Sequence, residues 1–235
     1  MKESFLINMI PLIQTKIFEN RIPIKAWEMA EIAAQDQCQP DLTKLTWEPI
    51  ELPLLWGRAY STCWFKTVVT IPEYFPEIGV ELLLNPNCEG LIYLNGKPFH
   101  GLDSNRLEIA LSTIRPGETV EIMLEAYHGP TELPTFFEYA ELAVVNPKVK
   151  ELFYHLTFGC NVLNSLDSNT TEYTDLLNEL FRATKLIDTS TQQANFLKTV
   201  QVALDYLNQG IYARQLSAAD KPEVWLTGHS HIDVA

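Results

Sequence analysis

The stretch Cys63-Trp64-Phe65-Lys66-Thr67-Val68-Val69-Thr70-Ile71 carries the clearest structural signal in this chain of 235 residues. Its odd positions hold Cys, Phe, Thr, Val and Ile, its even positions are mixed, and Pro72 ends the run. Successive side chains of a strand point to opposite faces of a sheet, so only one face of this segment suits a core. The pattern predicts a long antiparallel strand that is buried on one side.

Further short strands are expected around this one, six or seven in all between residues 60 and 146. Asn95-Gly96 separates the apolar run Leu91–Leu94 from Lys97–His100, and this dipeptide favours the tight turn of a hairpin. Arg115-Pro116-Gly117-Glu118 favours another turn. Regularly spaced strands with turn residues between them are typical of a β-sandwich, and we expect a jelly roll.

The hydrophobic period changes from 2 to 3.6 after Pro147, which predicts helices over residues 149–209. Asn169 stands three residues before Glu172, and Ser190-Thr191-Gln192-Gln193 has the form of a capping box. Both features are expected to start helices.

The composition is that of a globular protein, with 46% hydrophobic and 20% charged residues. A net charge of −13 without any basic run argues against nucleic acid and an anionic membrane surface as partners. No segment reaches the roughly 20 apolar residues that cross a bilayer, and the N-terminus lacks the pattern of a signal peptide. We expect a cytoplasmic protein whose scattered cysteines are reduced thiols, namely Cys38, Cys63, Cys88 and Cys160.

The last thirteen residues, Glu223 to Ala235, hold the clearest candidate for chemistry. The apolar run Val224–Leu226 leads into His229, His231 and Asp233. In an extended chain these alternate residues project to the same side. Imidazole and carboxylate groups that converge on one point are typical of a divalent-metal site of the zinc type, which needs three or four protein ligands.

The segment Gly228-His229-Ser230-His231-Ile232-Asp233-Val234-Ala235 resembles the start of the catalytic domain in α-mannosidases of glycoside hydrolase family 38. The resemblance implies that His231 and Asp233 bind zinc and that His229 lies nearby without being a ligand. It also implies that the nucleophile, an Asp that binds the metal too, and a distant His ligand lie downstream of Ala235. The catalytic residues are therefore unknown, and this chain alone is expected to be inactive. The full-length protein would hydrolyse terminal α-mannosides with retention of configuration.

The stretches Gly90–Gly96 and Gly101–Asp103 resemble the galactose-binding-like sandwich that precedes the barrel in these mannosidases. The expected fold is thus mainly β with α: a jelly-roll β-sandwich, a helical connector and the first strand of an α/β barrel. Within the lead-in, the stretch Ile24–Ala34 is left open between helix and strand. The expected parts are a lead-in segment of residues 1–46, a β-sandwich domain of 47–147, a helical connector of 148–222 and a truncated barrel start of 223–235.

Two other functions stay open at this stage. The chain could be a free-standing carbohydrate-binding module, or the start of a metal-dependent amidohydrolase, whose barrel also places a His-x-His pair after its first strand. The expected partner is an α-mannoside or oligosaccharide substrate. A homo-oligomer is a further expected partner, formed if the strand Val224–Leu226 pairs along its edge with a second copy.

The histidines outside the terminal element and the tryptophans can each be interpreted as functional or as structural residues. Three histidines have no Cys, Ser or carboxylate at a motif spacing and are expected to be loop or core residues: His100, His128 and His155. Four tryptophans would suit core packing, the commoner use, or a platform that stacks on apolar sugar faces: Trp27, Trp47, Trp56 and Trp64.

Overall fold

The computed structural model describes residues 1–32 and 40–212. The chain divides into two compact units. The described residues between 13 and 150 form a unit of strands, and residues 1–12 together with residues 151–212 form a unit of helices. Among the described helices, none combines the length and the apolarity that crossing a membrane requires.

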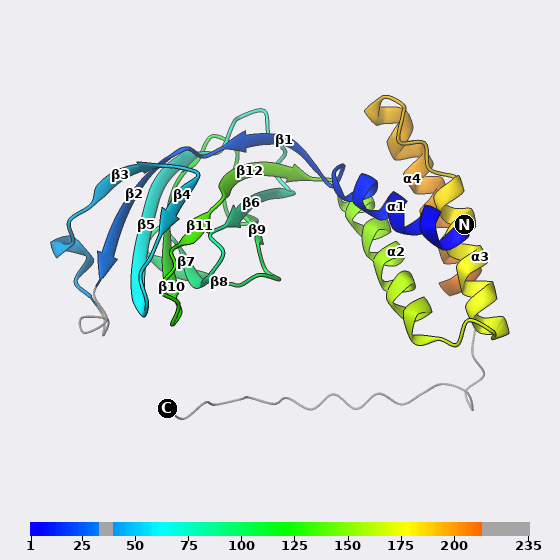
Figure 1. Ribbon diagram of the computed structural model, residues 1–235. Helices are drawn as coiled ribbons and strands as arrows, with labels where there is room; N and C mark the ends of the chain where they lie inside the picture. Colours follow the sequence, from blue (N-terminus) through cyan, green and yellow to red (C-terminus); the bar gives the residue numbers. More distant parts are fainter. Residues whose placement is uncertain (33–39, 213–235) are drawn as a thin grey trace, which may run out of the picture. The chain divides into compact units, whose positions relative to one another are not determined.

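The strand unit contains a six-stranded antiparallel sheet, drawn on the left of Figure 1. Its centre is the pair β5 and β10, which align over ten residues from Ser61 opposite His128 to Thr70 opposite Thr119. The odd positions of the opening stretch face the core as predicted, and Cys63 and Phe65 are fully buried. The order of the sheet is β3 (Glu48–Glu51), β2 (Ala26–Ile32), β5 (Ser61–Thr70), β10 (Thr119–His128), β7 (Glu89–Leu94) and β8 (Lys97–Leu102).

A second antiparallel sheet forms the other layer of the sandwich (Figure 1). Its order is β1 (Phe18–Pro23), β12 (Tyr139–Val145), β6 (Val80–Asn85) and β9 (Glu108–Ala110). A short pair, β4 (Leu54–Trp56) and β11 (Thr135–Phe137), completes the described strands. Two antiparallel layers over one core confirm the predicted jelly-roll sandwich.

Aromatic side chains fill the centre of the core. The ring of Phe65 meets the ring of Trp56 at 5.4 Å and that of Phe137 at 5.2 Å, both edge-on. Trp27 lies 5.6 Å from Phe137 on the other side. Edge-to-face contacts suit the ring quadrupole, and truncating a buried Phe to Ala costs about 3–5 kcal/mol. The core therefore joins both sheets and the short pair β4–β11.

The predicted hairpin at Asn95-Gly96 is confirmed, since it joins β7 to β8 and both residues have positive φ, 48° and 74°. A turn of this kind needs left-handed backbone at both central positions, which Asn and Gly tolerate best.

The boundary expected at residue 47 is wrong. Strands β1 and β2 lie inside the 1–46 lead-in, and they pair with β12 and β5 respectively. The open stretch Ile24–Ala34 forms β2 over most of its length. Its alternation was hard to recognise because Ala30 and Ile32 are buried on the face opposite to Trp27.

The helical unit contains α1 (Lys2–Gln14), α2 (Pro147–Ser165), α3 (Thr171–Lys185) and α4 (Gln193–Leu207), followed by a single π turn, η3 (Asn208–Tyr212). Pro147 opens α2, at the position where a missing N–H costs nothing. Phe5 of α1 packs edge-on against Phe181 of α3 at 5.5 Å, and the ammonium of Lys185 lies 4.4 Å from the Phe5 ring. The predicted helical region is confirmed.

The observed starts of α3 and α4 differ from the predicted ones. The cap of α3 is Thr170, whose hydroxyl accepts from the Tyr173 N–H, and not Asn169. The capping box at Ser190 is wrong, because α4 begins after Gln192 without a side-chain cap. The Ser190 hydroxyl instead donates to the Asp188 carboxylate at 2.6 Å, which closes a local turn that competes with capping.

A partly buried ion cluster fixes the first turn of α2 to the sandwich. The Lys150 ammonium lies 3.1 Å from the Glu81 carboxylate of β6 and 2.7 Å from the Glu108 carboxylate of β9. Burial raises the pKa of Glu81, although the attraction of Lys150 opposes this shift. Burial also disfavours the charge of Lys150, but its bonds to Glu108 and Glu81 outweigh that effect and raise its pKa.

We expect Lys150→Met to lower the free energy of unfolding by about 3 kcal/mol at pH 7, because it leaves the Glu81 carboxylate buried without its cation. The pKa of Glu81 is higher in the folded than in the unfolded state. Glu81 therefore stabilises the fold at acid pH, and this contribution is lost as the pH rises through its folded-state pKa. The defect should therefore shrink when Glu81 is protonated in acid. Urea unfolding of the wild type and the variant, at pH 7 and at acid pH, measures the difference in the free energy of unfolding.

Glu81→Gln is the matched control, because it removes the buried charge and leaves Lys150 its bond to Glu108. It should change stability by less than about 1 kcal/mol, and it should rescue part of the Lys150→Met defect in the double variant. A Lys150→Met defect that is equally large in acid, or absent at pH 7, would contradict this account of the cluster.

Candidate functional site

The metal-site residues predicted from the sequence, His231 and Asp233, lie outside the described residues, as does the neighbouring His229. Within residues 1–32 and 40–212, no group of three or more His, Cys, Asp or Glu side chains is arranged to hold a metal ion.

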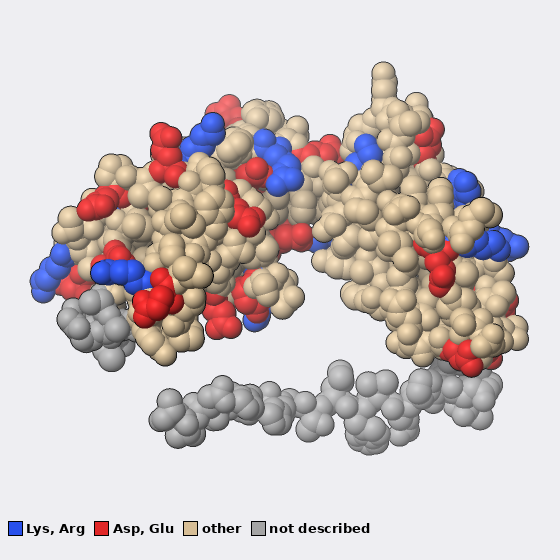
Figure 2. All heavy atoms as spheres, in the orientation of Figure 1, with Lys and Arg blue, Asp and Glu red and all other residues tan. Residues whose placement is uncertain are grey.

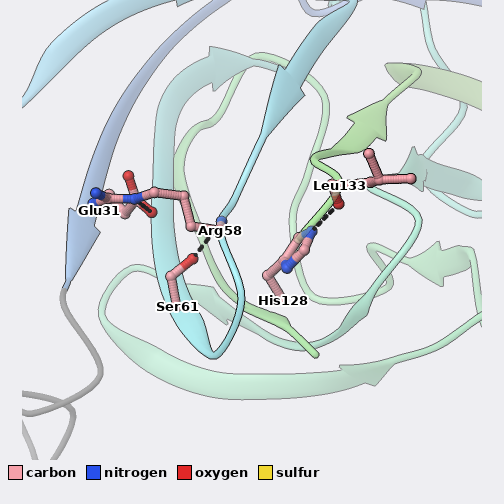
Figure 3. A network of polar contacts seen from close by, with 5 residues as sticks. All are labelled: Glu31, Arg58, Ser61, His128 and Leu133. Carbon is pink, nitrogen blue, oxygen red and sulfur yellow. Dashed lines mark hydrogen bonds and ion pairs between the residues drawn. The ribbon is translucent and has the colours of Figure 1, made fainter. Parts of the chain in front are cut away.

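The three remaining histidines are not gathered into one site. His128 ends β10, is only 2% exposed, and its Nε2 lies 3.0 Å from the Leu133 carbonyl oxygen (Figure 3). His100 is partly buried in β8. His155 of α2 lies 3.5 Å from the Glu151 carboxylate, one helical turn away. The expectation of a core residue fits His128, whereas His100 lies in a strand and His155 in a helix, each partly buried.

The tryptophans are used in packing, which leaves no exposed indole platform among the described residues. Trp27, Trp56 and Trp64 are at most 4% exposed. The indole N–H of Trp56 donates to the Pro86 carbonyl at 3.2 Å. Trp47 is partly buried, and the Lys66 ammonium covers its ring at 4.1 Å. A stacking platform for a sugar must therefore use a different aromatic residue.

A polar groove lies at one end of the sandwich, where the β6–β7 loop meets the ends of β7 and β10. It consists of two neighbouring hollows of about 330 and 470 Å³ that share the segment Asn87-Cys88-Glu89. We call their combined surface the end groove. The remaining lining residues of the smaller hollow include Tyr127, His128, Thr131 and Thr135, and those of the larger one include Asn85, Asp103 and Ser104.

Hydrogen bonds hold the shared segment in place. Asn87 has a left-handed backbone, with φ of 53°, and its amide group donates to the Phe136 carbonyl at 2.8 Å and to the Glu138 carboxylate at 3.1 Å. The side-chain amide of Asn85 donates to Glu138 at 2.9 Å, and its oxygen accepts from the Asn87 N–H. Because these side-chain amides hydrogen-bond to other parts of the protein, they hold the groove in one conformation.

The two side chains best placed to meet a ligand come from neighbouring strands. Tyr127 of β10 and Glu89 of β7 are directly opposite each other in the antiparallel register. Paired residues project from the same face with Cβ atoms about 4.5–5.5 Å apart. The Tyr127 side chain is 42% exposed. Glu89 is exposed as well, and its carboxylate makes no hydrogen bond or ion pair within the described part of the chain.

The wall behind the groove requires a glycine. Gly57 has φ of 84°, and a Cβ on it would come within 2.4 Å of the His128 ring. A larger residue there would be strained and would also displace the histidine. Next to it, Ser61 accepts from the Arg58 N–H and the Arg58 guanidinium pairs with Glu31 at 2.9 Å, as Figure 3 shows. This network fixes the chain that leads into β5.

The groove is acidic, and it offers no activated nucleophile. Neither hollow is lined by Lys or Arg. Hydrogen bonds from Arg106 hold the pKa of Asp103 below its usual value, so that carboxylate stays ionised. Burial raises the pKa of the Cys88 thiol to about 12, which keeps it neutral and unreactive. The chemistry of the groove is therefore suited to binding.

A third hollow of about 490 Å³ lies on the outer face of the six-stranded sheet, beside Lys66 and Glu28. These two side chains pair with each other at 2.7 Å, and Lys66 also covers Trp47. The charges of Lys66 and Glu28 are thus already satisfied. On the face drawn in Figure 2, acidic and basic side chains of the described residues are scattered among a largely uncharged surface.

Comparisons with known proteins agree with the fold. A family model described as the jelly roll domain of alpha-mannosidase matches residues 20–156. Alpha-mannosidase G of Dictyostelium discoideum is 20% identical over 249 residues, which cover 94% of this chain and 22% of that protein. Human alpha-mannosidase 2C1 is 25% identical over 209 residues, which cover 80% of this chain and 19% of that protein. The chain thus spans about a fifth of the length of these curated relatives.

Solved structures resemble the chain less closely. A beta-glucuronidase from Faecalibacterium prausnitzii has 18% identity and a TM-score of 0.35, covering 45% of this chain and 20% of its own. The beta-glucuronidase from Ruminococcus gnavus in its apo form has 10% identity and a TM-score of 0.40, covering 53% of this chain and 28% of its own. TM-scores this low carry no argument about the fold, so the description of the fold rests on the strand order of this chain. The family model covers more than half of the chain, and the chain therefore belongs to the alpha-mannosidase jelly roll domain family.

Proposed function

We propose that the full-length protein is a zinc-dependent retaining α-mannosidase that acts on terminal α-mannosides, and that this chain supplies its N-terminal part. The observation that carries the proposal is the match of residues 20–156 to the alpha-mannosidase jelly roll domain. The His-x-His-x-Asp element at 229–233 of the same chain supports it further. The relatives named above are themselves called alpha-mannosidases.

The donor chemistry of the terminal element suits zinc. The imidazole of His231 and the carboxylate of Asp233 are both common zinc ligands. Two ligands cannot hold a catalytic metal, so the remainder of the shell and the nucleophile would come from the downstream part of the full-length protein. When bound, zinc would position sugar hydroxyls. His231 must be neutral to bind it, so metal affinity should fall below a pH of about 6.5.

A cytoplasmic location is part of the proposal. Three described cysteines are free thiols, Cys63, Cys88 and Cys160, and burial raises the pKa of each of them. Free, unreactive thiols are usual in a reducing compartment, where disulfides are rare.

In the full-length protein, His231→Ala and Asp233→Ala should each remove zinc and α-mannosidase turnover together, because each removes a metal ligand. Metal content by mass spectrometry, and hydrolysis of an aryl α-mannoside at matched protein concentration, measure the two effects. We expect less than about 1% of wild-type turnover in either variant.

His229→Ala is the control for metal binding, because it removes an imidazole two residues away and should leave the zinc content unchanged. Zinc retained in His231→Ala or Asp233→Ala would overturn the ligand assignment. Full turnover in a metal-free variant would overturn the zinc-dependent mechanism.

The stereochemical outcome is a separate prediction. A retaining enzyme forms a covalent glycosyl intermediate and releases the anomer it started from. Proton NMR of the full-length protein acting on an aryl α-mannoside should therefore show α-mannose first, with the β-anomer appearing later by mutarotation. Initial release of β-mannose would indicate an inverting enzyme.

A further inference from the structure

We propose that the end groove of the jelly roll is a binding site for a neutral oligosaccharide. The inference rests on the groups in the groove and not on hydrolysis, so it can succeed or fail independently of the mannosidase proposal. Its evidence is the aromatic and carboxylate pair Tyr127 and Glu89, the rigid segment beneath them, and the absence of cations from the lining.

Tyr127 provides the flat apolar surface that a sugar ring needs. Its side chain is 42% exposed, whereas the tryptophans Trp27, Trp56 and Trp64 are buried. In an antiparallel sheet its ring stands out from the face beside Glu89. Aromatic rings gain from contact with apolar surfaces while a hydroxyl remains available at the edge. A sugar could therefore stack on Tyr127 with its hydroxyls directed to Glu89.

Glu89 provides acceptors that the protein leaves unused. Its carboxylate has no hydrogen bond or ion pair among the described residues, although it lies in the segment shared by both hollows. The hydroxyl of Ser104 in the larger hollow is likewise without a bond in that part of the chain. Sugar hydroxyls are donors, and bonds to an ionised acceptor are about twice as strong as neutral ones. Glu89 could serve sugar units in either hollow.

The site is preorganised. The bonds from Asn87 to Phe136 and Glu138, and the bond from Thr135 to the Asn87 carbonyl at 3.3 Å, hold the shared segment before any ligand arrives. In the wall, the Nδ1 of His128 is buried without a hydrogen-bond partner in the described residues. Buried polar atoms in proteins usually have a hydrogen-bond partner, so this one is an exception within the wall. Preorganisation lowers the entropic cost of binding.

Charge and size narrow the ligand class. Among the described residues, Glu89 leaves an unpaired negative charge in the groove, whereas Asp103 is paired with Arg106 at 2.5 Å, and neither hollow is lined by Lys or Arg. A sugar that carries carboxylate, sulfate or phosphate groups would be repelled, so the ligand is neutral. Hollows of about 330 and 470 Å³ fall within the range of small-ligand sites. Two neighbouring hollows favour an oligosaccharide over a monosaccharide.

The test uses the whole 235-residue chain and isothermal titration calorimetry. The probes are a neutral α-linked mannotriose, methyl α-mannoside and an anionic tri-galacturonate. We expect mannotriose to bind, with affinity about tenfold higher than that of either other probe. Tyr127→Ala and Glu89→Gln should each weaken mannotriose binding about tenfold. Tyr127→Phe should keep most of the affinity, because it retains the ring.

Tyr74→Ala and Glu77→Gln are matched controls, since both residues are exposed on the same sandwich outside the groove. They should leave the affinity within about twofold of wild type. Circular dichroism of each variant confirms folding, and Tyr127→Phe keeps the test decisive if Tyr127→Ala fails to fold. No binding up to about 10 mM, equal losses in the controls, stronger binding of tri-galacturonate, or binding abolished by a chelator would each overturn the proposal.

Discussion

The pairing of β5 with β10 is the constraint on which the rest of the sandwich depends. Ten consecutive residues of each strand are aligned, and this register places Phe65 opposite Leu124 on the buried face. Because side chains alternate along a strand, a shift of one residue would turn the whole buried set toward solvent. The aromatic contacts of Phe65 with Trp56 and Phe137 then tie the short strand pair β4–β11 to the same core. Fold specificity therefore rests on one register.

The same register produces the end groove. Where β10 ends, His128 points into the core and Tyr127 points out of it, opposite Glu89 of the neighbouring strand β7. The side-chain amides of Asn85 and Asn87 donate to Glu138, just before β12, and to Phe136 of β11 respectively. Because Asn85 belongs to β6 and Glu89 to β7, the groove joins residues from both layers of the sandwich. Core packing and the candidate binding surface thus have a single structural origin. Zinc binding would depend on a different part of the chain.

Much of the fold could be predicted from local patterns, and the failures have physical causes. The alternation at residues 63–71 and the Asn95-Gly96 turn predicted real elements, because each signal is complete within a few residues. Strand β1 gave no such signal: its register with β12 shifts between Glu19 and Ile22, and Asn20 has positive φ. Such a shift interrupts the alternation on which sequence reasoning depends.

The candidate site was less predictable than the fold. The end groove needs Glu89 to stand beside Tyr127, which is a long-range pairing that no motif spacing reveals. The alternation of β10 could have shown that Tyr127 faces outward, but not what lies next to it. The tryptophans were the more obvious aromatic residues for stacking on a sugar, but three of them are buried and cannot meet a ligand. The family resemblance came from the sequence and is confirmed, whereas the zinc ligands His231 and Asp233 remain a prediction.

The central claim is that the β5–β10 register holds both the core and the groove. Hydrogen exchange of backbone amides in the whole chain tests it most directly, since the slowest amides report the last region to open. We predict that the amides paired between Ser61–Thr70 and Thr119–His128 exchange most slowly in the sandwich, and that those in the loop 129–134 exchange fast. Exchange in β5 and β10 as fast as in that loop, with slower exchange elsewhere in the sandwich, would contradict the account.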